Sequence, residues 1–108
     1  MKFGVSVASY STMWDDIRAS IETMEAGRWD SLWVPDHFIP PSSWKGAEDQ
    51  PMHEAWTLIA AAAGMTEKLR LGHMVIGNTY RNPALVAKMA TTIDQISHGR
   101  FTLSIGAA

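Results

Sequence analysis

The chain has 108 residues, of which 46% are hydrophobic and 19% charged, and this composition is typical of a folded globular protein. Its formal net charge of −2 disfavours nucleic acid and acidic membrane surfaces as partners, and no apolar run is long enough for a membrane span. The absence of cysteine excludes disulfides, thiolate metal sites and cysteine nucleophiles, and it makes the cytoplasm the expected compartment.

The first predicted elements are a short strand and an amphipathic helix. Residues 2–8 alternate between apolar and small side chains, and this period of two favours a strand. Thr12 and Asp15 have the spacing of a capping box, so we expect a helix to begin there. Apolar residues on one helical face continue this pattern as far as Gly27, where we expect the helix to end.

The next predicted elements are a strand, a long loop and a second helix. Residues 30–35 form a short apolar run that ends in a proline, which cannot donate a hydrogen bond to a sheet. Residues 36–52 are rich in proline, glycine and serine and predict a loop, and loops of this length are usually functional or mobile. An alanine-rich helix follows between Trp56 and Ala63, with Gly64 expected at its C-terminal end.

The last predicted elements are two strands that flank a third helix. Residues 69–77 are almost continuously apolar, which predicts a strand buried on both faces. Asn82 and Pro83 supply an N-cap and a first-turn proline for a helix that Gly99 ends. Residues 100–106 predict a fourth strand.

Strands and helices alternate along the predicted chain, which requires a parallel sheet with right-handed crossovers. Two α/β architectures fit: a doubly wound open sheet and the N-terminal half of a TIM-type (β/α)8 barrel. A dinucleotide-binding open sheet would carry a glycine-rich turn after the first strand, and residues 8–12 contain no glycine. We therefore expect 1–108 to form about four β/α units of a barrel domain that is truncated at its C-terminus, because a complete barrel needs about 200–250 residues.

The strongest candidate for chemistry is the pair Asp36 and His37, directly after the second predicted strand. Barrel enzymes carry their catalytic groups on the loops that follow strands, and histidine gains and loses a proton near neutral pH. The alternative is that Asp36 caps a turn and His37 is an ordinary exposed loop residue. Trp44, in the same loop, either contacts a substrate or packs against the second helix.

A second polar segment follows the third predicted strand. Gly77 allows a ligand to approach the backbone closely, and Asn78 offers a hydrogen-bonding amide. The alternative is an ordinary transition from strand to loop.

The remaining histidines do not indicate a metal site. The spacings of His53, His73 and His98 from one another and from His37 match no metal-binding helical pair. We expect His73 to be a core histidine with its hydrogen bonds satisfied, and His98 to stabilise the end of the third helix.

Four segments carry a family resemblance: Ser-Leu-Trp-Val-Pro-Asp-His-Phe at 31–38, Glu-Ala-Trp-Thr-Leu at 54–58, Leu-Gly-His-Met-Val-Ile-Gly-Asn-Thr-Tyr-Arg-Asn-Pro-Ala at 71–84, and Asp-Gln-Ile-Ser-His-Gly-Arg at 94–100. Together they closely resemble the bacterial-luciferase-like superfamily. The Asp-His pair and the Gly-Asn-Thr-Tyr-Arg run resemble its branch of oxidoreductases that use the deazaflavin coenzyme F420. The FMN-dependent monooxygenases of the same superfamily are the alternative.

This resemblance implies a role for individual residues. His37 matches the family histidine near the reacting face of the deazaflavin, and Asp36 matches a neighbour that contacts cofactor or substrate. Met74 and Val75 fall where related enzymes have a cis peptide bond behind the tricyclic ring. Gly77 and Asn78 follow at the edge of the ring.

The resemblance also implies an activity: hydride transfer between the deazaflavin and a small organic substrate, with FMN chemistry as the alternative. It also implies a homodimer for the whole protein, and from the histidine spacings we expect no metal. Because a half barrel would leave the edges of its outer strands unpaired, a hypothesis of another class is a non-catalytic half barrel that assembles with a second half.

Overall fold

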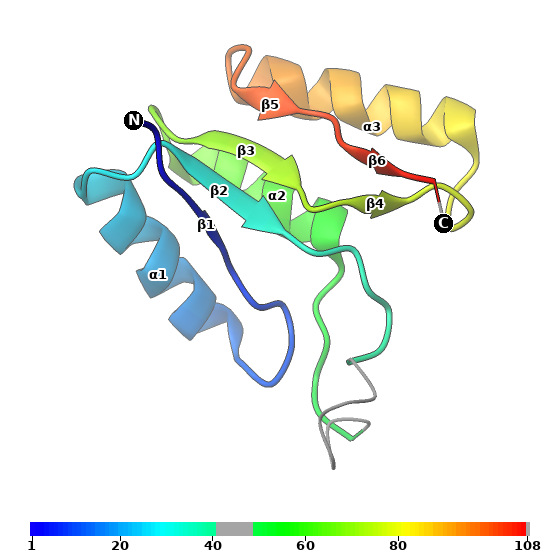
Figure 1. Cartoon of the computed structure of the whole chain (residues 1–108), viewed down its shortest axis with the longest axis horizontal. Coiled ribbons are helices and arrows are strands. Elements are labelled where there is room, and N and C mark those ends of the chain that lie inside the picture. Colours follow the sequence, from blue (N-terminus) through cyan, green and yellow to red (C-terminus); the bar gives the residue numbers. More distant parts are fainter. Residues whose placement is uncertain (41–48, 108) are drawn as a thin grey trace.

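The structure is a computed structural model that describes residues 1–40 and 49–107. Along the chain its elements are β1 (Gly4–Ser6), α1 (Trp14–Ala26), β2 (Ser31–Val34), α2 (Ala55–Met65), β3 (Arg70–His73), β4 (Ile76–Gly77), α3 (Pro83–Ile96), β5 (Phe101–Thr102) and β6 (Ile105–Gly106). Strands β1, β2, β3 and β5 form one sheet in that order, and β4 pairs with β6 in a second, two-stranded sheet. All of these pairs are parallel, and Figure 1 shows the three helices on the same side of the larger sheet.

The strand order confirms the predicted barrel-type topology. Helices α1 and α2 each connect two neighbouring strands, and α3 precedes β5, which pairs with β3, so the order in the larger sheet is the order in the sequence. In a doubly wound sheet the strand order would instead reverse at a switch point, and helices would cover both faces of the sheet. The described residues therefore have the parallel strand and helix arrangement of part of a TIM-type barrel.

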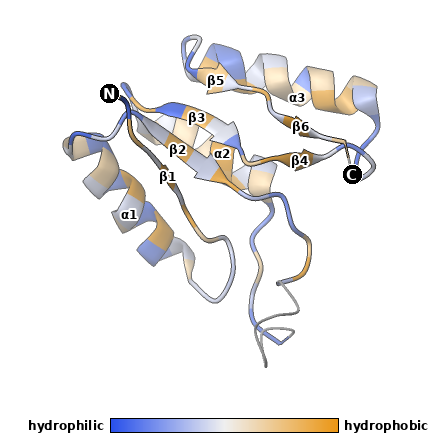
Figure 2. Ribbon diagram, in the orientation of Figure 1, coloured by the Kyte–Doolittle hydropathy of each residue, from blue (hydrophilic) through white to orange (hydrophobic). Residues whose placement is uncertain are grey.

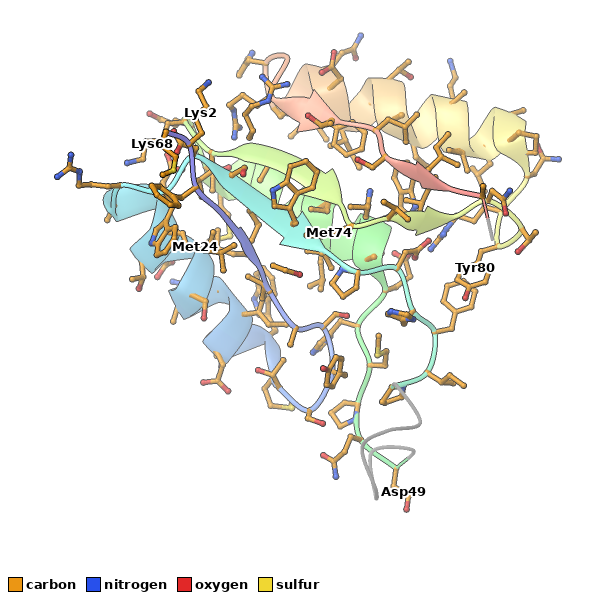
Figure 3. All side chains as sticks on the ribbon, in the orientation of Figure 1. Lys2, Met24, Asp49, Lys68, Met74 and Tyr80 are labelled. Atoms are coloured by element: carbon orange, nitrogen blue, oxygen red, sulfur yellow. The ribbon has the colours of Figure 1, made fainter. Side chains whose placement is uncertain are left out.

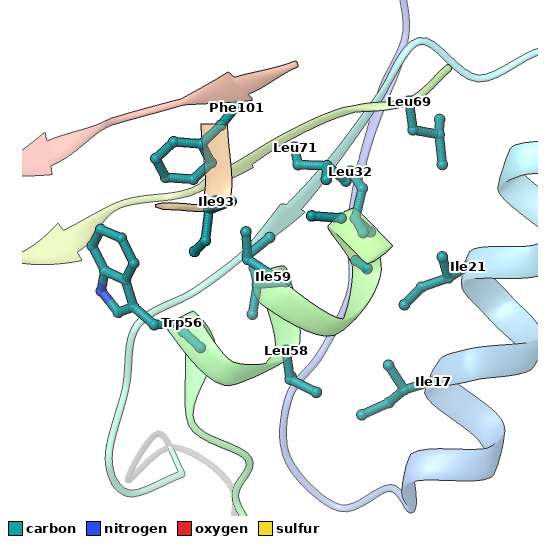
Figure 4. Close-up of a cluster of buried hydrophobic side chains, with 14 of the residues drawn as sticks. Ile17, Ile21, Leu32, Trp56, Leu58, Ile59, Leu69, Leu71, Ile93 and Phe101 are labelled. Carbon is teal, nitrogen blue, oxygen red and sulfur yellow. The ribbon is translucent and has the colours of Figure 1, made fainter. Parts of the chain in front are cut away.

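The core lies between the larger sheet and its helices, with α2 at its centre (Figure 4). Leu32 and Val34 of β2 and Leu71 of β3 are buried, whereas Trp33, which points to the opposite face, is only half-buried. Burial of such side chains contributes about 1.5–3 kcal/mol each to folding. One face of the sheet is thus covered by helices and the other carries the residues that face away from this core.

Helix α1 starts later than the sequence predicts. Met13 occupies the N-cap position and makes no side-chain hydrogen bond there, so the predicted capping box at Thr12 is wrong. The helix begins at Trp14, so Thr12 lies one residue too early to cap it, and the preceding Ser11 has a left-handed conformation with φ of 54°. The C-terminal end is as expected, with Gly27 directly after the last helical residue.

The other two helices differ in how well their ends could be predicted. Asn82 caps α3 by accepting a hydrogen bond from the backbone N–H of Ala84, and Pro83 is the first helical residue, as predicted. In α2 the predicted end at Gly64 is wrong, because the helix continues through this residue to the C-cap Thr66. The hydroxyl of Thr66 donates to the carbonyl of Ala62 and so satisfies a group in the last turn.

The third and fourth predicted strands are each divided in two. Residues 69–77 form β3 and β4, and residues 100–106 form β5 and β6, so the chain leaves the larger sheet and pairs again in the smaller one. The pairing strands β4 and β6 are hydrophobic in Figure 2. Between β3 and β4, Met74 and Val75 are exposed, so the predicted burial of 69–77 on both faces is wrong at these two residues.

Candidate functional site

The predicted site residues lie around the C-terminal ends of β2, β3 and β4. In Figure 3, Met74 and Tyr80 lie toward this end of the sheet, and Lys2 and Lys68 lie at the other. The two relevant chain segments are adjacent, because the backbone N–H of Met74 donates to the carbonyl oxygen of Val34, at 3.0 Å. The structure therefore brings the segments around residues 36 and 75 to one edge of the sheet.

Asp36 is buried at this edge, and its side chain is fully shielded from solvent. One carboxylate oxygen accepts hydrogen bonds from the backbone N–H of Gly77, at 3.1 Å, and from the guanidinium of Arg81, at 2.6 Å. The other oxygen accepts a second hydrogen bond from Arg81, at 2.9 Å. Asp36 is thus held by a two-pronged ion pair, a geometry that is stronger and more specific than a single contact.

Arg81 also binds Glu54, the residue that caps α2. One Glu54 oxygen accepts from Arg81, and the other accepts from the backbone N–H and the hydroxyl of Thr57. Burial would raise the pKa of Glu54, but the hydrogen bonds from Thr57 and Arg81 outweigh it and lower that pKa. Hydrogen bonding to Asp36, with a further contribution from Glu54, raises the pKa of Arg81. We call Asp36, Glu54 and Arg81 the ion cluster.

His37 directly follows Asp36 of the ion cluster in the sequence and is exposed. The next residue, Phe38, stacks on the ring of Tyr80, with ring centres 4.6 Å apart. The guanidinium of Arg81 lies over the Phe38 ring, at 5.3 Å. The two residues that flank the exposed His37, Asp36 and Phe38, therefore both contact other residues at this end of the sheet.

Met74 and Val75 are joined by a cis peptide bond, as the family resemblance implies. Their side chains are 55% and 44% exposed, respectively, although both are apolar. Val75 also lies against the backbone of Gly106, where a β-carbon would come within 2.7 Å of a Val75 methyl carbon. Exposed apolar surface at the C-terminal end of the sheet fits a flat, largely apolar ring such as a flavin or deazaflavin.

The other two predicted cofactor residues differ in their surroundings. Gly77 is half-buried, its N–H donates to Asp36, and the ring of Tyr80 lies against the place where a β-carbon would be. Asn78 is exposed. Gly77 therefore contributes to the packing and hydrogen bonding below the surface of the site, whereas Asn78 is exposed to solvent.

His73 is buried, as predicted, but its hydrogen bonds are not satisfied. Within the described part of the chain, neither ring nitrogen has a hydrogen-bond partner. The ring lies between Trp56 and Phe101, with centroid distances of 4.6 and 5.9 Å, so its neighbours offer mainly aromatic surface. Burial lowers the pKa of His73 to about 4, partly opposed by the charge of Asp36. The prediction of a satisfied core histidine is therefore wrong.

The remaining candidates are far less informative. In residues 1–40 and 49–107, no three side chains of histidine, aspartate or glutamate are grouped as a metal ion would require. A ring nitrogen of His53 lies 3.0 Å from the carbonyl oxygen of Thr12, and His98 directly follows the C-cap of α3. Trp44 lies outside the described residues.

A groove of about 710 Å³ runs between α2 and α3, on the helical side of the sheet. Its lining is mostly apolar and includes Leu85 and Ile96, which are 52% and 43% exposed. Phe38, Glu54 and Arg81 border it, but none of the five predicted cofactor residues and not His37 line it. The groove is therefore distinct from the exposed surface at Met74 and Val75.

Arg81 and Glu54 are the site residues that the sequence did not single out. They bind each other across 27 positions, and Arg81 binds Asp36 across 45, so no local pattern reveals the pairing. A weaker signal was present: Glu54 stands two residues before the predicted start of a helix, where the helix dipole favours a carboxylate.

Comparison with known proteins gives a consistent family. The whole chain, residues 1–108, matches the model of the luciferase-like monooxygenase family. A phthiodiolone/phenolphthiodiolone dimycocerosates ketoreductase from Mycobacterium sp. (strain JLS) is 38% identical over 103 residues, covering 82% of this chain and 27% of that protein. An F420-dependent glucose-6-phosphate dehydrogenase from Amycolatopsis mediterranei (strain U-32) is 34% identical over 95 residues, covering 85% of this chain and 26% of that protein.

A solved structure shows the same fold. An F420-dependent secondary alcohol dehydrogenase in complex with an F420-acetone adduct superposes with a TM-score of 0.81 and 27% identity, over 99% of this chain and 32% of the other. The chain thus spans about a quarter of the length of the curated relatives it matches. Among the helices of the described residues, none has both the length and the apolar character needed to cross a membrane.

Proposed function

The chain belongs to the luciferase-like monooxygenase family, and on this basis we propose that the whole protein is an oxidoreductase that transfers hydride between coenzyme F420 and a small organic substrate. Two similar proteins, the glucose-6-phosphate dehydrogenase and the secondary alcohol dehydrogenase, are named as F420-dependent. The observation that carries the proposal is that the exposed His37 follows β2 while the exposed apolar side chains of Met74 and Val75 follow β3, its neighbour in the sheet.

In this proposal the edge of the sheet holds the cofactor. Met74 and Val75 supply the apolar surface on which a flat ring packs, and Asn78 supplies a polar contact at its edge. Asp36 and Gly77 complete the set of proposed cofactor residues by supporting this surface from beneath, since the Gly77 N–H donates to the buried Asp36 carboxylate. A bound deazaflavin supplies a ring carbon that accepts or releases hydride.

His37 is the proposed catalytic residue. When an alcohol is oxidised, the hydride leaves its carbon for the cofactor and the hydroxyl proton must go elsewhere. An imidazole nitrogen of His37 takes that proton, and in the reverse direction it returns the proton to the carbonyl oxygen. The products of oxidation are then a carbonyl compound, a reduced cofactor and a protonated histidine.

The substrate class follows from the same chemistry. A ketoreductase and a secondary alcohol dehydrogenase both interconvert a carbonyl and an alcohol, and both are similar to this chain. We propose an alcohol or carbonyl compound as the substrate. The second candidate is an FMN-dependent monooxygenase, and the description of the matching family favours a monooxygenase.

For the whole protein we propose further properties that accompany this function. The described β/α units form part of a longer barrel domain, because relatives of about three times this length share the fold. The whole protein is a homodimer in the cytoplasm, with no metal requirement. Light scattering on the whole protein tests the dimer, and a monomeric mass would contradict it.

The cofactor is tested by titrating the whole protein separately with oxidised F420 and with FMN and following ligand fluorescence. We expect F420 to bind at least about tenfold more tightly than FMN, a difference of about 1.4 kcal/mol. Glucose 6-phosphate and 2-propanol are then added as hydride donors, and reduction is followed as loss of F420 absorbance. Tighter binding of FMN, without reduction of F420, would favour the monooxygenase instead.

A further inference from the structure

The ion cluster contains a contact pattern that the proposed catalytic role of His37 does not explain. Arg81 reaches both residues that flank His37 in the sequence: it forms the two-pronged ion pair with Asp36 and lies 5.3 Å over the ring of Phe38. Nothing on His37 itself is needed for these contacts. One arginine therefore fixes the backbone on both sides of the exposed imidazole.

Arg81 also connects this segment to the rest of the edge. Its pairing with Glu54 joins it to the first turn of α2, since Glu54 caps that helix. Asp36 accepts from the N–H of Gly77, so the same cluster reaches the end of β4. The ring of Tyr80, next to Arg81 in sequence, stacks on Phe38.

The ion pair between Asp36 and Arg81 is shielded from solvent. The side chain of Asp36 is fully buried and that of Arg81 is 10% exposed, whereas Glu54 retains 40%. An exposed ion pair is screened by water and contributes little, but a buried carboxylate requires its partner. Arginine suits this position better than lysine because its planar fork binds both carboxylate oxygens and stacks on aromatic rings.

We propose that Arg81 is a positioning residue: through Asp36 and Phe38 it holds the segment that carries His37 at the distance and angle required at the cofactor edge. The role assigned to His37 rests on the proposed function, but the positioning of the segment does not. Small displacements of a catalytic group cost a large part of the rate, so a loosened segment slows hydride transfer.

The test uses Arg81→Lys in the whole protein. Arg81→Met would leave Asp36 buried without a partner and endanger folding, whereas lysine keeps the charge and removes the fork. Arg18→Lys is the matched control, because Arg18 is exposed and pairs only with Glu22 of the same helix in the described structure.

The first measurement is exchange of the Gly77 amide hydrogen by NMR, which needs neither cofactor nor substrate. This amide donates to Asp36, so Arg81→Lys is expected to accelerate its exchange by about tenfold or more, while Arg18→Lys leaves it unchanged. Unchanged exchange in Arg81→Lys would overturn the proposal. An increase of the same size at amides throughout the chain would also overturn it, since that would indicate general destabilisation.

The second measurement is a double-mutant cycle on the rate of hydride transfer, with Arg81→Lys introduced beside His37 and beside His37→Ala. We expect Arg81→Lys to slow the rate by about tenfold or more when His37 is present, and by less than about twofold when it is absent. Equal losses in both backgrounds would overturn the positioning role. If the unmodified protein transfers no hydride to or from F420, the proposed function fails, and Gly77 exchange alone decides the role of Arg81.

Discussion

His73 lies at the end of β3, where its ring is enclosed by Trp56 and Phe101. Because burial lowers its pKa to about 4, from an ordinary value of 6.5, the folded protein takes up this proton later than the unfolded chain as the pH falls. Above about pH 6.5 both states are neutral at this residue and it contributes no pH dependence. Between about pH 6.5 and 4 the unfolded state binds more protons, so stability falls with falling pH.

We therefore expect the free energy of unfolding of the whole protein to fall by up to about 1.4 kcal/mol per pH unit over this range because of His73. Urea unfolding at several pH values between 7 and about 4.5 measures the slope. His73→Leu is the comparison, since it fills the site with an apolar group that does not titrate. Parallel slopes for the two proteins would show that His73 titrates normally in the folded state.

At the residue level, the sequence was informative about exposed positions and uninformative about the pairs beneath them. His37 could be placed at the edge because it follows a strand that ends in Pro35. Arg81 could not be assigned a partner, because its carboxylates come from segments that meet only in the folded chain. The hydrogen bonding of His73 was mispredicted for the same reason, since its aromatic neighbours come from other elements.

At the level of elements, the start of α3 provides a direct test of a local signal. The Asn82 side chain accepts a hydrogen bond from the N–H of Ala84, at 2.9 Å, and so satisfies one of the free donors of the first turn. Asn82→Ala is expected to lower the free energy of unfolding by about 1 kcal/mol, measured by urea unfolding of the whole protein. Asn82→Asp keeps an acceptor at the positive end of the helix and should be nearly neutral. Equal losses for both substitutions would mean that the cap does not stabilise the helix.

The ends of an element could be predicted where adjacent residues determine them, but not where pairing with a distant strand determines them. Asn82 and Gly27 marked helix ends correctly because capping is a property of a few adjacent residues. The division of the strands around residue 74 could not be predicted from their hydrophobicity, since both halves are apolar and only the partner strand differs. Gly64 was a misleading end signal, because α2 packs in the core and continues for another residue.

At the level of the whole molecule, alternation of strand and helix was enough to predict the parallel sheet but not its strand order, since a doubly wound sheet alternates in the same way. The sequential order of a barrel was preferred because residues 8–12 lack the glycine-rich turn of a dinucleotide-binding sheet. The family resemblance then added what alternation cannot supply, the position of the cis bond at Met74 and Val75. The chain spans about a quarter of its curated relatives, so experiments on function belong to the whole protein.

His37 is proposed to serve hydride transfer at this end of the sheet and not to be needed for folding. The direct measurement is the rate of hydride transfer between F420 and the donor that reduces it, for the unmodified whole protein and for His37→Ala, with a thermal melt of each. We predict a rate lower by about 10²–10⁴ in His37→Ala, with an unchanged melting temperature and little change in F420 affinity. An unchanged rate, with or without a lower melting temperature, would contradict the claim and leave His37 as an ordinary residue of the loop.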